Sequence, residues 1–162
     1  MSIAFAEFET ATQSEHFVPR AKATRTSLLH CLIVSSDAER REFFTGAAEA
    51  AGWQVTAQAE ASEASAVAHR VRHSLAIVDL EGAEAGNCGG LRSLAEQLST
   101  DAQRLLMVCG TEENPREEIW ARQLGVWLYL SGVDTTCDIE SLCSEAKQVA
   151  DKLAAPAYAR TA

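Results

Sequence analysis

The chain has 162 residues, a formal net charge of −9 and a pI near 4.9, with 47% hydrophobic and 23% charged residues. This length and composition predict one globular domain around a single core. The negative charge disfavours contact with nucleic-acid phosphates or anionic lipid, so neither is expected as a partner.

The cysteines and the amino terminus indicate where the protein works. The five cysteines form no C-x-x-C pair, and Cys31 and Cys109 lie in or beside apolar runs, so a secreted disulfide framework is not expected. The first residues lack a basic start and a long apolar stretch, and no apolar run reaches transmembrane length. We therefore expect a cytoplasmic protein with no membrane partner.

Regular patterning begins at residue 28. Residues 1–27 show no sustained hydrophobic period and are expected to form a flexible arm, and residues 154–162 a tail. Between them, short apolar runs predict strands at 28–34, 53–57, 75–78, 105–109 and 126–130. Helical spacing predicts helices at about 36–51, 62–72, 91–99, 115–124 and 139–153, with a flexible glycine-rich loop over 82–90.

Capping residues mark several helix ends. Ser36 with Glu39 three residues later predicts a capping box, and Gly52 predicts the end of the same helix. Asn114 followed by Pro115 predicts the start of the fourth helix.

Five strands alternating with five helices predict an α/β fold, a doubly wound (βα)5 parallel sheet. In such a sheet the carboxyl ends of the first, third and fourth strands meet at the switch point, where ligands bind. Asp79 ends the third predicted strand and is the most informative residue there. The residues that follow the first and fourth strands are Ser35, Ser36 and Asp37, and Cys109 and Thr111.

Over residues 28–153 the chain resembles the receiver domain of two-component response regulators. The resemblance rests on the strand–helix order, the stretch over 32–40, the strand end Ile77-Val78-Asp79 and the segment over 125–130. It implies a flavodoxin-like sheet in the order 2-1-3-4-5 and a phosphoryl group that Asp79 accepts from a histidine kinase.

The positions that the resemblance assigns to phosphate chemistry depart from the family pattern. Ser35 and Ser36 stand where the family has two Mg²⁺-binding acids, and Asp37 comes one place late. Gly132 stands at the family's lysine. Because hydroxyls bind Mg²⁺ less well than carboxylates, and phosphoryl transfer depends on charge neutralisation, we expect Asp79 to lack cationic neighbours and to be phosphorylated poorly or not at all.

The resemblance also assigns the switch positions. Cys109, with Thr111 two residues on, matches the family's threonine or serine, and Tyr129 matches the aromatic switch residue. A simpler role for Asp79 is to cap the turn that follows it. His69 and His73 lie four residues apart without a further ligand and are expected at the surface, and His30 at a core or edge position.

The resulting hypothesis is a pseudo-receiver in signal transduction: a protein-interaction module with no enzymatic activity, catalytic residue or cofactor. Its partner is expected to be a histidine kinase, another regulator or a second copy, bound by the fourth helix, fifth strand and fifth helix. The interface candidates are Trp120, Trp127 and Tyr129. One alternative is a phosphorylatable regulator in which Asp37 and Asp79 hold Mg²⁺. Another is a redox or small-molecule sensor that uses Cys88 or Cys109.

Overall fold

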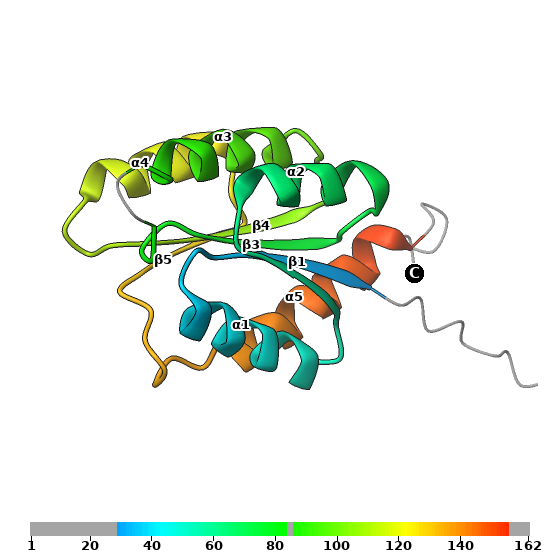
Figure 1. Cartoon of the computed structure of the whole chain (residues 1–162). Helices are drawn as coiled ribbons and strands as arrows, with labels where there is room; N and C mark the ends of the chain where they lie inside the picture. The colour runs from blue at the N-terminus through cyan, green and yellow to red at the C-terminus, as the bar shows by residue number, and fades with distance from the viewer. Residues whose placement is uncertain (1–28, 84–85, 156–162) are drawn as a thin grey trace, which may run out of the picture.

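The computed structural model describes residues 29–83 and 86–155 (Figure 1). The strands are β1 (His30–Val34), β2 (Gln54–Gln58), β3 (Leu75–Asp79), β4 (Leu105–Gly110) and β5 (Leu128–Ser131). The helices are α1 (Ala38–Ala50), α2 (Ala61–Arg70), α3 (Cys88–Ser99), α4 (Pro115–Leu124) and α5 (Ile139–Ala154). The predicted arm over 1–27 lies outside the described residues, and so does most of the predicted tail, although Ala154 still belongs to α5.

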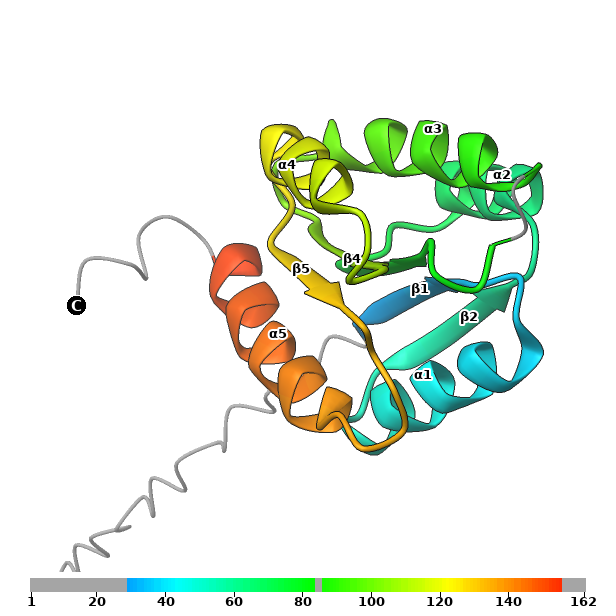
Figure 2. The same ribbon diagram turned by 90° about the vertical axis from the view of Figure 1, so that its left-hand side faces the viewer.

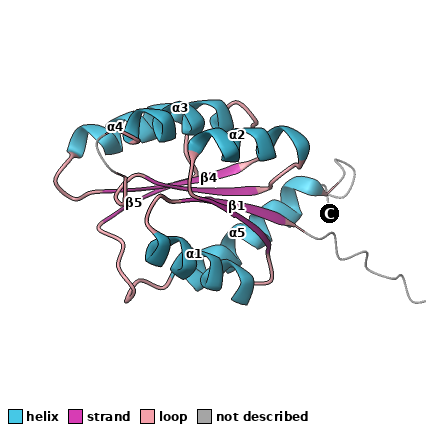
Figure 3. Cartoon of the chain, viewed as in Figure 1, coloured by secondary structure: helices cyan, strands magenta, loops and turns pink. Residues whose placement is uncertain are grey.

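The five strands form one parallel sheet in the order β2-β1-β3-β4-β5, which confirms the predicted topology. Helices α1 and α5 cover one face, and α2, α3 and α4 cover the other (Figures 1, 2 and 3). In the register, Val34 pairs with Val78, and Asp79 pairs with Cys109. The carboxyl ends of β1, β3 and β4 therefore meet at one edge of the sheet, as predicted.

The core has two layers because successive strand residues point to opposite faces. On the α1/α5 face, Ile33, Ile77 and Met107 are fully buried. On the other face, Leu32 and Val78 pack with the apolar side of α3. The central strand β3 is buried along its whole length, so Asp79 is carried into the interior by the strand that it ends.

The start of α1 differs from the prediction. Asp37, not Ser36, is the N-cap: its carboxylate accepts a hydrogen bond of 3.0 Å from the Arg40 backbone N–H. The Ser36 hydroxyl instead donates to the Ala59 carbonyl, at 3.4 Å. The predicted capping box is therefore wrong, because the segment before α2 takes the serine hydroxyl. The other signals hold: Asn114 and Pro115 begin α4, and Gly52 follows α1 with φ of +84°.

Other boundaries move by a few residues. Helix α3 begins at Cys88, inside the predicted flexible loop, and β5 begins at Leu128, two residues later than expected. The later start of β5 follows from Val126, whose N–H bonds the Ala121 carbonyl of α4 at 3.4 Å. Among the described residues, no helix is both long and apolar enough to cross a bilayer.

Candidate functional site

Asp79 lies at the carboxyl end of β3 with no exposed surface. Its Oδ2 accepts hydrogen bonds from the Ser35 hydroxyl at 2.7 Å and from Arg40 Nε at 2.8 Å. Its Oδ1 accepts from Arg40 Nη2 at 2.9 Å and from the Glu81 N–H at 3.3 Å. The contact with Glu81 is the turn cap expected from the sequence, but most of the carboxylate's bonding capacity goes to the arginine and the serine.

Arg40 is the cation of this site, and it comes from the first turn of α1. Besides its two-pronged contact with Asp79, its Nη1 donates to the Val133 carbonyl at 2.7 Å, and its Nη2 lies 3.0 Å from Glu81 Oε2. The guanidinium also lies over the Phe44 ring, 5.6 Å from its centroid. The hydrogen bond to Asp79 raises the pKa of Arg40 despite partial burial.

The expectation that Asp79 has no cationic neighbour is therefore wrong. Nothing in the spacing of two residues 39 positions apart shows that they meet. One signal was present in the sequence: Arg40 lies in the first turn of a helix, where a positive charge opposes the helix dipole. A cation at that position indicates a compensating anion nearby, and Asp79 provides it.

The residues at the positions that the resemblance matches to the family's Mg²⁺ site make other contacts. Asp37 is exposed and caps α1, and the Ser35 hydroxyl is bonded to Asp79. Ser36 accepts a hydrogen bond of 2.9 Å from Asn87 Nδ2. A hollow of about 590 Å³ opens beside these groups; its lining residues are Ser36, Asp37, Glu60, Gly82, Gly86 and Asn87.

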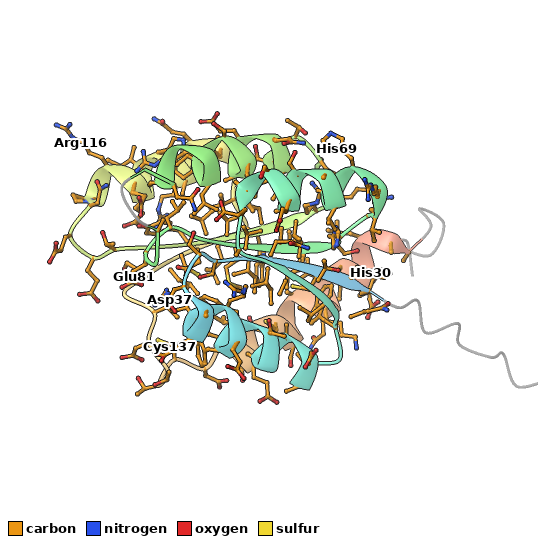
Figure 4. The ribbon with its side chains drawn as sticks, in the orientation of Figure 1. His30, Asp37, His69, Glu81, Arg116 and Cys137 are labelled. Atoms are coloured by element: carbon orange, nitrogen blue, oxygen red, sulfur yellow. The ribbon has the colours of Figure 1, made fainter. Side chains whose placement is uncertain are left out.

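This donor set does not fit Mg²⁺ as arranged. Mg²⁺ requires carboxylate or water oxygens in near-octahedral geometry, and both oxygens of Asp79 are bonded to a guanidinium. Within residues 29–83 and 86–155, no group of three or more His, Cys, Asp or Glu side chains is arranged to hold a metal ion. Asp37 and Glu81 extend from neighbouring segments at this edge (Figure 4), and Arg40 contacts Glu81.

Solved structures identify the fold family. CheY4, a chemotaxis response regulator of Vibrio cholerae, aligns with a TM-score of 0.58 and 19% identity, covering 76% of this chain and 99% of that one. A CheY-like receiver domain protein from Methanospirillum hungatei aligns with 0.62 and 19%, covering 78% and 97%. A two-component response regulator from Clostridium difficile aligns with 0.63 and 14%, covering 78% and 99%. This chain has the receiver fold. No protein-family model and no curated protein matches the sequence.

In this receiver fold, Cys109 pairs with Asp79 across the sheet and is fully buried. Burial raises the pKa of the Cys109 thiol well above its usual value, and the charge of Asp79 raises it further, while Arg40 opposes. A buried thiol with a raised pKa forms little thiolate, so it reacts slowly. Thr111 follows β4 at a partly exposed position.

Tyr129, the predicted counterpart of the family's aromatic switch residue, faces the start of α4. Its hydroxyl donates to Glu117 Oε1 at 3.3 Å, and Arg92 Nη2 donates to Glu117 Oε2 at 2.9 Å. Burial and the Glu117 carboxylate raise the pKa of Tyr129 to about 12. Sequence reasoning missed Glu117, because an acid in the first turn of a helix ordinarily complements the dipole at the surface. Here Glu117 is only 5% exposed.

The aromatic interface candidates separate onto two faces. Trp120 is partly exposed on α4, where the Arg92 guanidinium lies 5.1 Å from its ring centroid. Trp127 packs against the core layer under α1 and α5. Ile119, which the sequence did not single out, is 57% exposed on α4. Gly132, the predicted counterpart of the family's lysine, has φ of +62°, and the Glu112 side chain lies where a side chain on Gly132 would extend.

The two histidines four residues apart lie in different surroundings. Helix α2 ends at Arg70, so His69 and His73 do not share a helix face. His69 is exposed, as predicted, but His73 is only 1% exposed, so the surface prediction for His73 is wrong. The ring of His73 lies edge-on to His30, with centroids 6.2 Å apart. Burial, followed by the charge of Arg104, lowers the pKa of His73 to about 4.

Proposed function

We propose that this chain is a receiver-like signalling module that acts through protein contacts, with Asp79 held in an unreactive ion pair. The observation that carries the proposal is the two-pronged contact of Arg40 with both oxygens of Asp79, at 2.8 and 2.9 Å. Paired charge-assisted hydrogen bonds of this geometry are among the strongest polar contacts in proteins. Because the carboxylate is fully buried, they are formed with little competition from water.

The ion pair opposes phosphorylation in two ways. A phosphoryl acceptor needs a carboxylate oxygen free to attack in line, and both oxygens of Asp79 are engaged. Mg²⁺ binding would require Arg40 to leave, and the guanidinium would then lose Asp79, Glu81 and the Val133 carbonyl together. The internal cation thus takes the place that a metal ion would need.

The observed contacts support the two alternative functions less well. If Asp37 and Asp79 held Mg²⁺, Asp37 would no longer cap α1, and Asp79 would lose its ion pair with Arg40. A thiol sensor at Cys109 conflicts with the raised pKa and complete burial of that residue. Cys88 is partly exposed at the start of α3, beside the Arg92 guanidinium, and stays available to reagents.

The proposed contact surface lies on α4, β5 and α5. Ile119 and Trp120 offer apolar area on α4, and β5 is a short strand at the edge of the sheet. Partly desolvated aromatic side chains are frequent anchors of protein interfaces. We propose a kinase, another regulator or a second copy as the partner.

Phosphorylation is tested with acetyl phosphate and Mg²⁺, read by intact mass. The wild-type protein and Asp79→Asn are expected to show no phosphate adduct. Arg40→Ala frees the carboxylate and tests the lock directly, with Arg116→Ala as the matched control because Arg116 is exposed at the start of α4 (Figure 4). An adduct on the wild-type chain that disappears in Asp79→Asn would overturn the proposal.

The contact surface is tested by affinity capture with the full chain, comparing wild type, Ile119→Asp and Asp79→Asn. A partner or self-association that Ile119→Asp abolishes and Asp79→Asn retains supports the proposal. Binding that depends on Asp79 and ignores Ile119 contradicts it. Light scattering of each variant distinguishes self-association from binding of another protein.

A further inference from the structure

We infer that Glu117 is a positioning residue that holds Tyr129 inward and so fixes the α4–β5 surface in one conformation, independently of Asp79. That this surface binds a partner rests on the proposed function. The role of Glu117 in holding Tyr129 depends only on contacts among β4, β5, α3 and α4.

The first step is the position of the Glu117 carboxylate. Glu117 lies in the first turn of α4, and its side chain turns into the protein, where only 6% of it is exposed. A buried carboxylate is unfavourable unless its oxygens are bonded. Tyr129 of β5 donates a hydrogen bond to Oε1, and Arg92 of α3 donates one to Oε2, so each oxygen has a donor.

The missing side chain at Gly110 leaves space for these two groups. A Cβ added to Gly110, the last residue of β4, would overlap both Glu117 Oε1 and the Tyr129 hydroxyl. The two polar groups therefore lie directly against the backbone at the end of β4. Glycine at this position is what allows the tyrosine hydroxyl to lie against the end of β4.

Arg92 connects the Glu117–Tyr129 contact with the surface of α4. The Arg92 guanidinium that binds Glu117 also stacks on Trp120 at 5.1 Å, and the Trp120 indole N–H donates to Glu96 Oε1 at 3.3 Å. Tyr129 and Trp120 are thus connected through the Glu117 carboxylate and the Arg92 guanidinium. None of these contacts involves Asp79 or Arg40.

The test uses the full chain with Tyr158→Phe and 3-fluorotyrosine, so that Tyr129 gives a single ¹⁹F resonance. The solvent isotope shift between H₂O and D₂O measures the exposure of its ring. In the parent and in Asp79→Asn, the shift is expected to be the same and well below that of a free tyrosine, because Tyr129 is partly buried. Glu117→Gln, which keeps the shape and weakens both contacts, is expected to move the resonance and increase the shift. Gly110→Ala is expected to increase it toward that of a free tyrosine, and Gly46→Ala is the control because its added Cβ meets open space.

The inference is overturned if Glu117→Gln leaves the resonance and isotope shift unchanged, or if Asp79→Asn changes them as much as Glu117→Gln does. If Gly110→Ala does not fold, the ¹⁹F measurement on Glu117→Gln decides between the outcomes. Phosphorylation of Asp79 with an unchanged Tyr129 signal would refute the proposed function but leave the role of Glu117 intact.

Discussion

Replacing Arg40 with methionine tests the central ion pair. Methionine keeps an unbranched apolar stem over Phe44 but leaves the fully buried Asp79 carboxylate with only Ser35 and the Glu81 N–H as donors. Removing one partner of a buried ion pair costs about 3–5 kcal/mol. Because 20% of the Arg40 side chain is exposed, water reaches part of the pair, and we expect about 3 kcal/mol.

Urea denaturation at pH 7, followed by tryptophan fluorescence, measures this loss. Asp79→Asn in the Arg40→Met background is expected to restore about 2 kcal/mol, since it removes the unpaired charge. Arg116→Met is the matched control and is expected to change stability by less than about 0.5 kcal/mol. A cost below about 1 kcal/mol for Arg40→Met, or no coupling with Asp79→Asn, would refute the reasoning.

The remaining predictions concern groups away from Asp79. His73 has a folded pKa of about 4, lowered by burial and the charges of Arg104 and His30, so the folded state favours the neutral ring. The stabilisation that comes from the neutral His73 ring is complete above pH 6.5. As the pH falls toward 4, the free energy of unfolding decreases by about 3 kcal/mol on this account. His73→Leu should flatten the fall in urea midpoint over this range, and an equally steep fall would contradict the assignment. Cys137 and Cys88 should react with Ellman's reagent in the folded protein, whereas the buried Cys31, Cys109 and Cys143 should react only in denaturant; rapid reaction of a third thiol would show that the core is more open. Gly125→Ala should cost about 1 kcal/mol, because φ is +76° there, while Gly46→Ala inside α1 should stabilise by up to about 1 kcal/mol. Equal effects of the two substitutions on thermal unfolding would argue against the left-handed backbone at Gly125.

The fold could be predicted from the sequence because its signals are local. Continuous apolar runs such as 75–78 and the helical spacing over 139–153 each depend on neighbours along the chain, and strand alternation then limits the topology. Gly52 and Pro115 likewise mark helix ends through their own backbone preferences. The capping box failed because Ser36 and Asp37 both suit an N-cap, and a distant carbonyl decided between them.

The candidate site was only half predictable. The placement of Asp79 follows from where its strand ends, but its partner Arg40 lies on a helix, and a helix rotation of one residue would have aimed that side chain elsewhere. Glu117 was missed for the same reason: its burial depends on the missing side chain at Gly110 and on donors from α3 and β5. Pairings across elements are properties of packing, and a single sequence does not display them.

The Arg40 guanidinium carries a consequence for how such a module is controlled. If the module works as proposed, with Asp79 neutralised by Arg40 in place of phosphate chemistry, its binding form needs no phosphate. The proposal then implies that the amount of protein, set by synthesis and degradation, determines the strength and duration of the signal.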